Sequence, residues 1–292
     1  MPGFTSITGE ENIMYADNCS FDGTDRGGAM TADGQLWIGR TAGSPSVGLG
    51  VLTSPLGTLS IGYSYPNITL DVGTLPYFNS INIQTITSSG TYTPTAGTQW
   101  VIVECCGGGG AGGGTATHTN GYSAGGAGGS GEYRRGTYSA MTIGSSVSVT
   151  IGAGGTGNSA AAGGNGGNTS FGAFITANGG SGGQTSGTIT TSAAYAQGGA
   201  GGTGGSGGNF ASDGNPGDTG MAFNVLNGGT GGSSYFGGGA LSPVLLNPIG
   251  AISGNNATGY GSGGSGSAGA VNASAQIGGN GSSGVIVVTE YL

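Results

Sequence analysis

Apolar and polar residues alternate in short runs along this chain, and each run ends at glycine, proline, asparagine or serine. Alternation over about four to eight residues is typical of half-buried β-strands. No stretch repeats apolar residues at i, i+3 and i+4 for long enough to predict a helix. The pattern therefore predicts an all-β protein. The clearest runs before residue 90 are QLWIGRT, GVLTS, TLSIGYS, NITLDV and SINIQTIT.

Two of these runs repeat one another. GQLWIGRT (34–41) and GTLSIGYS (57–64) share the form G-x-L-x-I-G-x-[ST], and a turn containing proline follows each of them. A strand–turn unit of roughly twenty residues cannot bury its apolar face alone, so it must stack on neighbours or on other chains. We therefore expect a short-strand repeat module over residues 17–88.

The second part of the chain is framed by strands and filled with glycine. QWVIVEC opens it, SSVSVTIGAGG continues it and GVIVVTEYL closes it, and most of the 74 glycines of the 292-residue chain lie between the first and the last. The stretch GGAGGTGGSGGN (198–209) consists of perfect G-G-x triplets. A period of three matches the polyproline II helix, which has about three residues per turn.

Glycine helices of this kind can pack side by side and hydrogen-bond to one another. Ordering each residue costs about 1–2 kcal/mol, and glycine loses more freedom than most residues. The sequence thus predicts that strands pin the glycine helices, giving residues 89–292 a β-sandwich-like frame around a polyglycine II-like core. Disorder is the alternative; a composition that is 35% apolar and 5% charged argues against it.

Charge excludes two classes of partner. The chain has four arginines, no lysine and a net charge of -8. It lacks the basic stripe that nucleic acid requires and the polybasic patch that anchors proteins to anionic membranes. No run of about 18 apolar residues predicts membrane insertion. The N-terminus shows no basic segment followed by an apolar one, so no signal peptide is visible.

The glycine-rich part carries a family resemblance. SGTYTPTAGTQWVIVECCGGGGAGGG, SVSVTIGAGGTG, GGNTSFG, YGSGG and GSSGVIVVTEY follow one another in the order of the glycine-rich domain that ends many bacteriophage tail-fibre proteins. Residues 88–292 resemble that domain, and the preceding repeats more loosely resemble the shafts of fibrous β-proteins. The resemblance implies a structural or receptor-binding protein and no enzyme. The lack of a long shaft, coiled coil or evident virion-attachment domain favours a filament-forming relative.

The adjacent cysteines, Cys105 and Cys106, are the first candidates for chemistry. Neighbouring residues of a strand point to opposite faces, so these thiols cannot readily share one metal ion. Zinc needs about four ligands, and only His118 and the distant Cys19 remain. We therefore expect no metal, no cofactor and no redox site, and a small buried residue on each face of the strand.

The acidic residues are sparse. DGTDRGG (22–28) and DGNPGD (213–218) are typical turn sequences, although their oxygen-rich loops leave calcium binding open. A catalytic carboxylate pair, as in polysaccharide-degrading enzymes, is a third and more distant alternative. We expect no enzymatic activity.

Aromatic residues in the glycine-rich loops are candidates for binding. Tyrosine among serine, glycine and asparagine provides rigid contact area at low entropic cost. Such loops could bind a cell-surface glycan or protein, or they could fill gaps and seal a subunit interface. The candidate residues are His118, Tyr122, Tyr235, Phe236 and Tyr260.

Residues 1–16 form the last candidate element. Ile7, Ile13, Met14 and Tyr15 are apolar and have no partner strand next to them in sequence. An extended arm of this kind can add to an open sheet edge of another subunit. Repeated head to tail, such a contact makes a filament. The four residues are therefore predicted to serve assembly.

These observations favour a non-catalytic structural subunit. We expect it to self-assemble into an extracellular or virion-associated β-rich fibre by strand addition between subunits, with other copies of itself as the partner. The alternative is a receptor-binding adhesin at the tip of a trimeric phage tail fibre.

Overall fold

The computed structural model describes residues 59–64, 67–72, 80–190, 193–246 and 249–292. The chain forms two compact units, Met1–Tyr77 and Phe78–Leu292. The all-β prediction is confirmed, because the regular elements of the described residues are strands apart from the single turn of α1 (Ala140–Ile143). The predicted arm 1–16 and the first repeat, 34–41, lie outside the described residues.

The first unit contains one described hairpin. β1 (Leu59–Ser64) and β2 (Asn67–Val72) pair antiparallel, with Leu59 opposite Val72 and Ser64 opposite Asn67. These are the predicted strands TLSIGYS and NITLDV.

The second unit begins with a β-sandwich. Its first sheet has the strand order β13-β7-β5-β19-β3, formed by Phe210–Ser212, Tyr133–Ser139, Trp100–Cys106, Val285–Tyr291 and Ile81–Ile86. Its second sheet has the order β12-β10-β9-β8-β4, formed by Ser206–Gly207, Ile175–Ala177, Thr169–Phe171, Val147–Thr150 and Gly90–Tyr92. All pairings within both sheets are antiparallel.

Alternate residues of both sheets form the sandwich core. Val101, Val103 and Cys105 of β5 are fully buried against Phe171 and Ile175 of the opposite sheet. Burying each large apolar side chain contributes about 1.5–3 kcal/mol. The predicted opening and closing strands, β5 and β19, pair along their whole length. They are therefore the centre of the frame.

Strand β3 belongs to this second unit. The sequence predicts SINIQTIT within the 17–88 module, whereas the structure pairs β3 with β19 from Ile81 opposite Tyr291 to Ile86 opposite Ile286. The boundary of the compact units accordingly falls between Tyr77 and Phe78.

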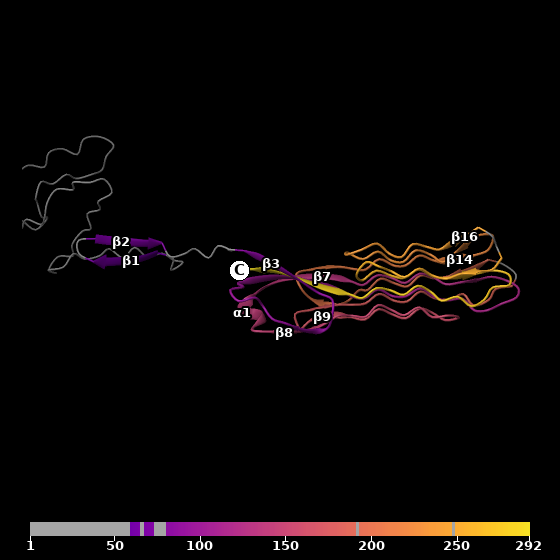
Figure 1. The fold of residues 1–292 in the computed structure, drawn as a ribbon, viewed down its shortest axis with the longest axis horizontal. Helices are drawn as coiled ribbons and strands as arrows, with labels where there is room; N and C mark the ends of the chain where they lie inside the picture. The colour runs from indigo at the N-terminus through magenta and orange to yellow at the C-terminus, as the bar shows by residue number, and fades with distance from the viewer. Residues whose placement is uncertain (1–58, 65–66, 73–79, 191–192, 247–248) are drawn as a thin grey trace, which may run out of the picture. The chain divides into compact units, whose positions relative to one another are not determined.

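Two smaller sheets close the other end of the second unit. One has the order β11-β14-β15-β16, formed by Ala194–Ala196, Gly220–Ala222, Leu226–Asn227 and Val244–Leu245. The other has the order β17-β18-β6, formed by Ala251–Ile252, Ala268–Gly269 and Ser123–Ala124. Buried alanines surround Leu226 there. Between the two ends, glycine-rich segments run side by side as wavy traces, from the labels β7, β8 and β9 to the labels β14 and β16 (Figure 1).

The hydrogen bonds of segment 107–115 show how these traces pack. Every third N–H donates to the same neighbour, so the three series reach three different segments, 126–132, 161–167 and 276–282, all antiparallel. The first series has N···O distances of 2.8–2.9 Å and runs from Gly107 to Glu132, from Gly110 to Gly129 and from Gly113 to Gly126. A helix of about three residues per turn presents its N–H groups in this way.

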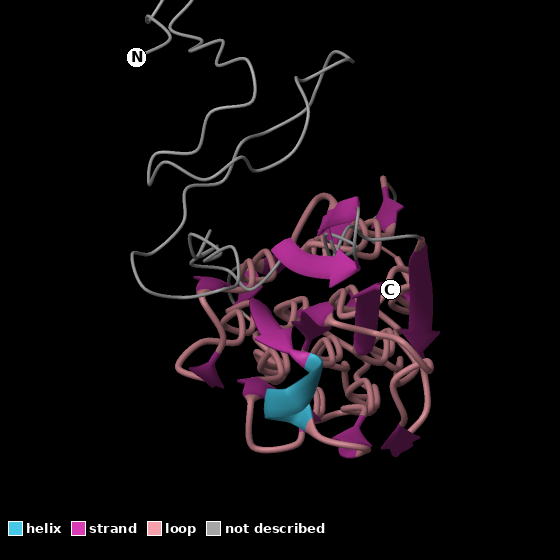
Figure 2. Cartoon of the chain, turned by 90° about the vertical axis from the view of Figure 1, so that its left-hand side faces the viewer, coloured by secondary structure: helices cyan, strands magenta, loops and turns pink. Residues whose placement is uncertain are grey.

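The carbonyl groups of segment 107–115 accept from three further segments. Donors come from 180–183 and 264–267, and from Gly155. Segment 107–115 therefore has six neighbours, and segment 125–132 likewise bonds to six. This is a hexagonal lattice of helices, and these helices form the polyglycine II-like core that the sequence predicts. Figure 2, turned by 90° from Figure 1, shows the glycine segments end-on as small coils.

Close approach of the backbones explains the demand for glycine. A Cβ atom added to Gly110 would lie 2.1 Å from the carbonyl oxygen of Ser181, and one added to Gly128 would lie 2.1 Å from that of Gly110. Both distances are far below van der Waals contact. No side chain fits at these positions unless the neighbouring backbone moves.

Asparagine side chains complete hydrogen bonds of the lattice. The Oδ1 atom of Asn165 accepts from the N–H of Gly182 at 2.9 Å, and that of Asn280 accepts from Gly157 at 2.7 Å. Asn168 accepts in the same way from Gly179 at 3.0 Å. These side chains take the place of a carbonyl of an adjacent helix, so the amide N–H groups find partners.

The stretch DGNPGD is a lattice segment, which corrects the prediction of a turn. Gly214 and Gly217 donate to the carbonyls of Gly202 and Gly199, at 2.9 Å each. Pro216 is exposed and fits because its fixed φ suits a polyproline II-like helix. The residues on either side of Pro216 keep their backbone N–H groups, and Gly214 and Gly217 donate the hydrogen bonds of this segment.

Candidate functional site

A buried carboxylate joins the lattice to the sandwich. Glu132 ends the segment 125–132 and precedes β7, and its side chain is fully buried. Arg134 lies two residues further along the chain, so its side chain is on the same side of the strand as that of Glu132. Its Nε atom donates to Oε1 of Glu132 at 2.7 Å, and its Nη1 atom donates to the carbonyl of Gly207 at 2.8 Å. Arg134 therefore holds Glu132 with one nitrogen and connects β7 with β12 through the other.

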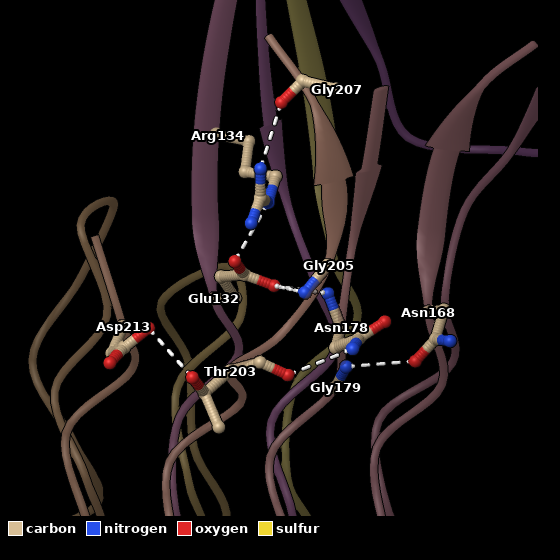
Figure 3. Close-up of polar contacts among 9 residues, drawn as sticks. All are labelled: Glu132, Arg134, Asn168, Asn178, Gly179, Thr203, Gly205, Gly207 and Asp213. Atoms are coloured by element: carbon tan, nitrogen blue, oxygen red, sulfur yellow. Dashed lines mark hydrogen bonds and ion pairs between the residues drawn. The ribbon is translucent and has the colours of Figure 1, made fainter. Parts of the chain in front are cut away.

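The second oxygen of Glu132 holds two lattice segments. Oε2 accepts from the N–H of Asn178 at 3.0 Å and from the N–H of Gly205 at 2.9 Å (Figure 3). Asn178 in turn donates to the carbonyl of Thr203 at 2.8 Å. Both carboxylate oxygens are thus used by structural donors. We interpret Glu132 as an anchor and not as a catalytic acid or base.

Among the residues that the structure describes, Glu290 of β19 is the second fully buried carboxylate. Five groups donate to it at 2.6–3.1 Å: the amides of Asn82 and Gln84, the hydroxyl of Tyr92, and the N–H and hydroxyl of Thr95. Burial opposes ionisation, but the hydrogen bonds from Thr95, Tyr92 and Asn82 outweigh it and lower the pKa of Glu290 to about 2. The charge ties β3 and the loop 93–99 to β19.

This depressed pKa predicts acid sensitivity. The ionised form of Glu290 is favoured in the folded state, so its contribution to stability is complete above the unfolded carboxyl pKa of about 4.3 and is lost as the pH falls toward 2. Urea unfolding at pH 7, 4 and 2.5 should show a falling free energy of unfolding. In Glu290→Gln the part of this fall that comes from Glu290 should disappear; an unchanged pH profile would contradict the assignment.

The two cysteines are buried on opposite sides of β5. Cys105 lies in the sandwich core, and Cys106 packs against Gly261, where an added Cβ would meet its sulfur at 2.4 Å. Burial raises the pKa of both thiols, that of Cys106 to about 12. Neither thiol can form a reactive thiolate at neutral pH. Among the described residues, no three His, Cys, Asp or Glu side chains gather in an arrangement that could hold a metal ion.

An aromatic cluster lies where β7 meets the lattice. Tyr133, which is almost fully buried, stacks on Tyr235 with ring centroids 3.8 Å apart and an interplanar angle of 17°. Phe210 and Phe236 meet the Tyr133 ring edge-on, at 6.1 and 5.9 Å. The Tyr133 hydroxyl donates to Glu104. Tyr235 is 62% exposed, so the cluster presents an aromatic surface to solvent.

The structure separates the predicted binding residues into two groups. Tyr235, Phe236 and Tyr260 come together at the aromatic cluster, because Phe236 forms a β-bridge with Tyr260. His118 and Tyr122 lie at the other end. Sequence reasoning missed Phe210, although an aromatic residue beside a G-G-N triplet was an available signal.

His118 and Tyr122 pack among the small sheets. His118 forms a β-bridge with Ala273, and its Nδ1 atom lies 2.9 Å from the carbonyl oxygen of Ala116. Tyr122 bridges to Ile189 and packs on Phe223 with ring centroids 5.6 Å apart. Both residues have structural contacts in this part of the unit.

The same end carries exposed apolar side chains, which we call the distal apolar patch. In the register of β11, β14, β15 and β16, Tyr195 lies opposite Met221, and Asn227 separates Met221 from Val244. The exposed members of the patch are Tyr195, Met221, Phe223, Val244 and Leu246. Exposed apolar patches of this kind mark interaction surfaces.

A third exposed apolar surface lies on the outer face of the five-stranded sheet that contains β5. Trp100 and Ile81 both lie opposite Tyr291, on either side of it, and Ile102 and Ile83 flank Thr289 in the next row. Ile81, Ile83 and Trp100 are 59%, 62% and 46% exposed. We call these two rows of residues the outer apolar face.

Across the described residues, no helix is long and apolar enough to cross a membrane.

The fold and these surfaces define a protein built on a hydrogen-bonded glycine lattice. The family model described as Glycine-rich domain matches residues 85–291, and the chain belongs to that family. No curated protein matches the chain.

Proposed function

We propose that this protein is a non-catalytic structural subunit that self-assembles into an extracellular or virion-associated β-rich fibre. The observation that carries the proposal is the outer apolar face, which extends over β5, β19 and β3. Exposed isoleucine side chains on β3 and an exposed tryptophan on β5, in register across β19, are typical of a surface that another chain covers. A second copy is the simplest partner.

The lattice supports a structural role. Its core consists of closely packed backbones whose hydrogen bonds repeat in three directions, and its buried carboxylates serve as anchors. Such a body offers few side chains for chemistry and few accessible sites for proteases. A fibre subunit needs this kind of rigidity. The resemblance of residues 88–292 to tail-fibre domains supports an extracellular or virion-associated setting.

A second candidate function is a receptor-binding adhesin at the tip of a trimeric phage tail fibre. The distal apolar patch favours it, because a rigid scaffold holds exposed aromatic and aliphatic side chains at the end opposite the sandwich. Tyrosine and phenylalanine in such positions suit recognition of a cell-surface glycan or protein.

Electron microscopy of the purified full chain tests the proposal. Long filaments at neutral pH support the fibre subunit. Discrete trimeric rods that bind cells, with binding lost in Tyr195→Ala together with Phe223→Ala, support the adhesin instead. Particles that remain monomeric by mass photometry and bind no cells would refute both functions. Release of reducing sugar from a bacterial capsule would refute the absence of catalysis.

A further inference from the structure

Strand β3 lies at the edge of its sheet as far as the described residues extend. It is the last strand of its sheet, and no described strand pairs with its outer side. The N–H of Leu292 donates to the carbonyl of Ser80 at 3.0 Å, so Ser80 and Leu292 form a hydrogen-bonded pair at the start of the ladder between β3 and β19. Because hydrogen-bonded and non-bonded pairs alternate, Asn82 and Gln84 bond to β19, and Ile81, Ile83 and Thr85 direct their N–H and C=O groups outward.

The side chains at this edge suit an added strand. Ile81 and Ile83 lie on the outer apolar face and are mostly exposed. The strand INIQTI has no charged residue and no proline, the devices that protect natural edges from further pairing. A strand beside β3 would gain main-chain hydrogen bonds and cross-strand contacts with both isoleucines. The outer apolar face would then extend over one more strand.

We propose that residues 1–16 of a second copy add to β3 as this strand. The inference rests on the proposed self-assembly and names the contact that carries it. In an extended segment, Ile7, Ile13 and Tyr15 share one face, because their positions differ by even numbers. That face would continue the outer apolar face next to Ile81 and Ile83.

The donor and the acceptor lie on different parts of the chain. Residues 17–80 separate the arm from β3, so the donor and the acceptor are distinct segments of each copy. The contact joins two different surfaces and is therefore heterologous. Repetition without closure extends a filament.

Two variants that assemble only with each other test the inference. Ile83→Pro removes one outward N–H of the acceptor, a position at which an edge strand tolerates proline, and leaves the arm intact. Deletion of residues 1–16 removes the donor and leaves the acceptor intact. We expect each variant alone to stay near the 27.6 kDa mass of one chain. A mixture of the two should form one-to-one heterodimers in sedimentation velocity, without filaments.

Controls separate assembly from folding. Both variants should keep the circular dichroism spectrum and the unfolding midpoint of the wild type. Ile83→Lys, which keeps the N–H but charges the edge, should also weaken assembly by tenfold or more. Leu241→Lys, a matched loss of an exposed apolar residue outside both named apolar surfaces, should leave assembly unchanged.

The outcomes distinguish the two proposals. If the wild type does not assemble, the proposed function fails. If the wild type assembles and both variants still form filaments, only the strand addition is wrong. Dimers of the arm-deleted chain alone would show that β3 pairs with β3 of a second copy, which would also overturn the role of the arm.

Discussion

Replacing Gly110 by alanine should destabilise the second unit by about 3 kcal/mol or more, at the upper end of what overpacking costs. The new Cβ atom would lie 2.1 Å from the carbonyl oxygen of Ser181 and 2.9 Å from the N atom of Gly182. Both are backbone atoms of a helix that is itself bonded on several sides. The lattice cannot move this helix without stretching hydrogen bonds to its other neighbours.

Gly238→Ala is the matched control. Gly238 lies in the same kind of sequence, G-G-G, but an added Cβ would meet no atom within 4 Å, and its φ is not positive. Alanine should there leave stability unchanged or raise it by about 0.4–1 kcal/mol, through a less flexible unfolded chain. Urea unfolding followed by circular dichroism measures both variants. Equal effects at the two positions would show that close helix packing does not set the glycine requirement.

The repeat along the sequence predicted the lattice, but not its connections. The triplets of 198–209 and the apolar strands β5 and β19 could be predicted, because each shows its periodicity within a short stretch of the sequence. The six neighbours of segment 107–115 come from stretches as distant as 155 and 282. Nearly identical glycine triplets carry no information about which one bonds to which, so the pairing depends on the frame and the loops.

The roles of polar residues within the lattice could not be predicted from the sequence either. Asn165 and Asn280 resemble turn residues, yet they accept hydrogen bonds from neighbouring helices. Pro216 suggested a turn for the same reason. A residue that favours turns also suits the edge of a polyglycine II-like lattice. In both situations an asparagine side chain can replace a backbone carbonyl as hydrogen-bond acceptor, and a proline fits where no backbone N–H is needed. Only the three-dimensional arrangement separates them.

The anchor Glu132 was likewise unpredicted, since a single glutamate after G-G-S-G has no motif. Its role leads to a second strong prediction: Glu132→Gln should lower stability by about 2–4 kcal/mol. The substitution preserves shape, but an amide presents one oxygen and one NH₂ group. Whichever way it turns, the NH₂ group faces a donor, either Nε of Arg134 or the N–H groups of Asn178 and Gly205. The guanidinium of Arg134 also loses its buried counter-charge.

Glu104→Gln provides the matched comparison, because here the Tyr133 hydroxyl is the one group among the described residues that donates to the carboxylate. The amide oxygen of glutamine can accept that bond, so the loss should stay below about 1 kcal/mol. Hydrogen exchange would locate the effect. Glu132→Gln should accelerate exchange of the amides of Asn178 and Gly205 far more than those of the distal sheets, since the junction opens first. Uniform acceleration over the whole unit would mean that Glu132 stabilises the fold without acting as a local anchor.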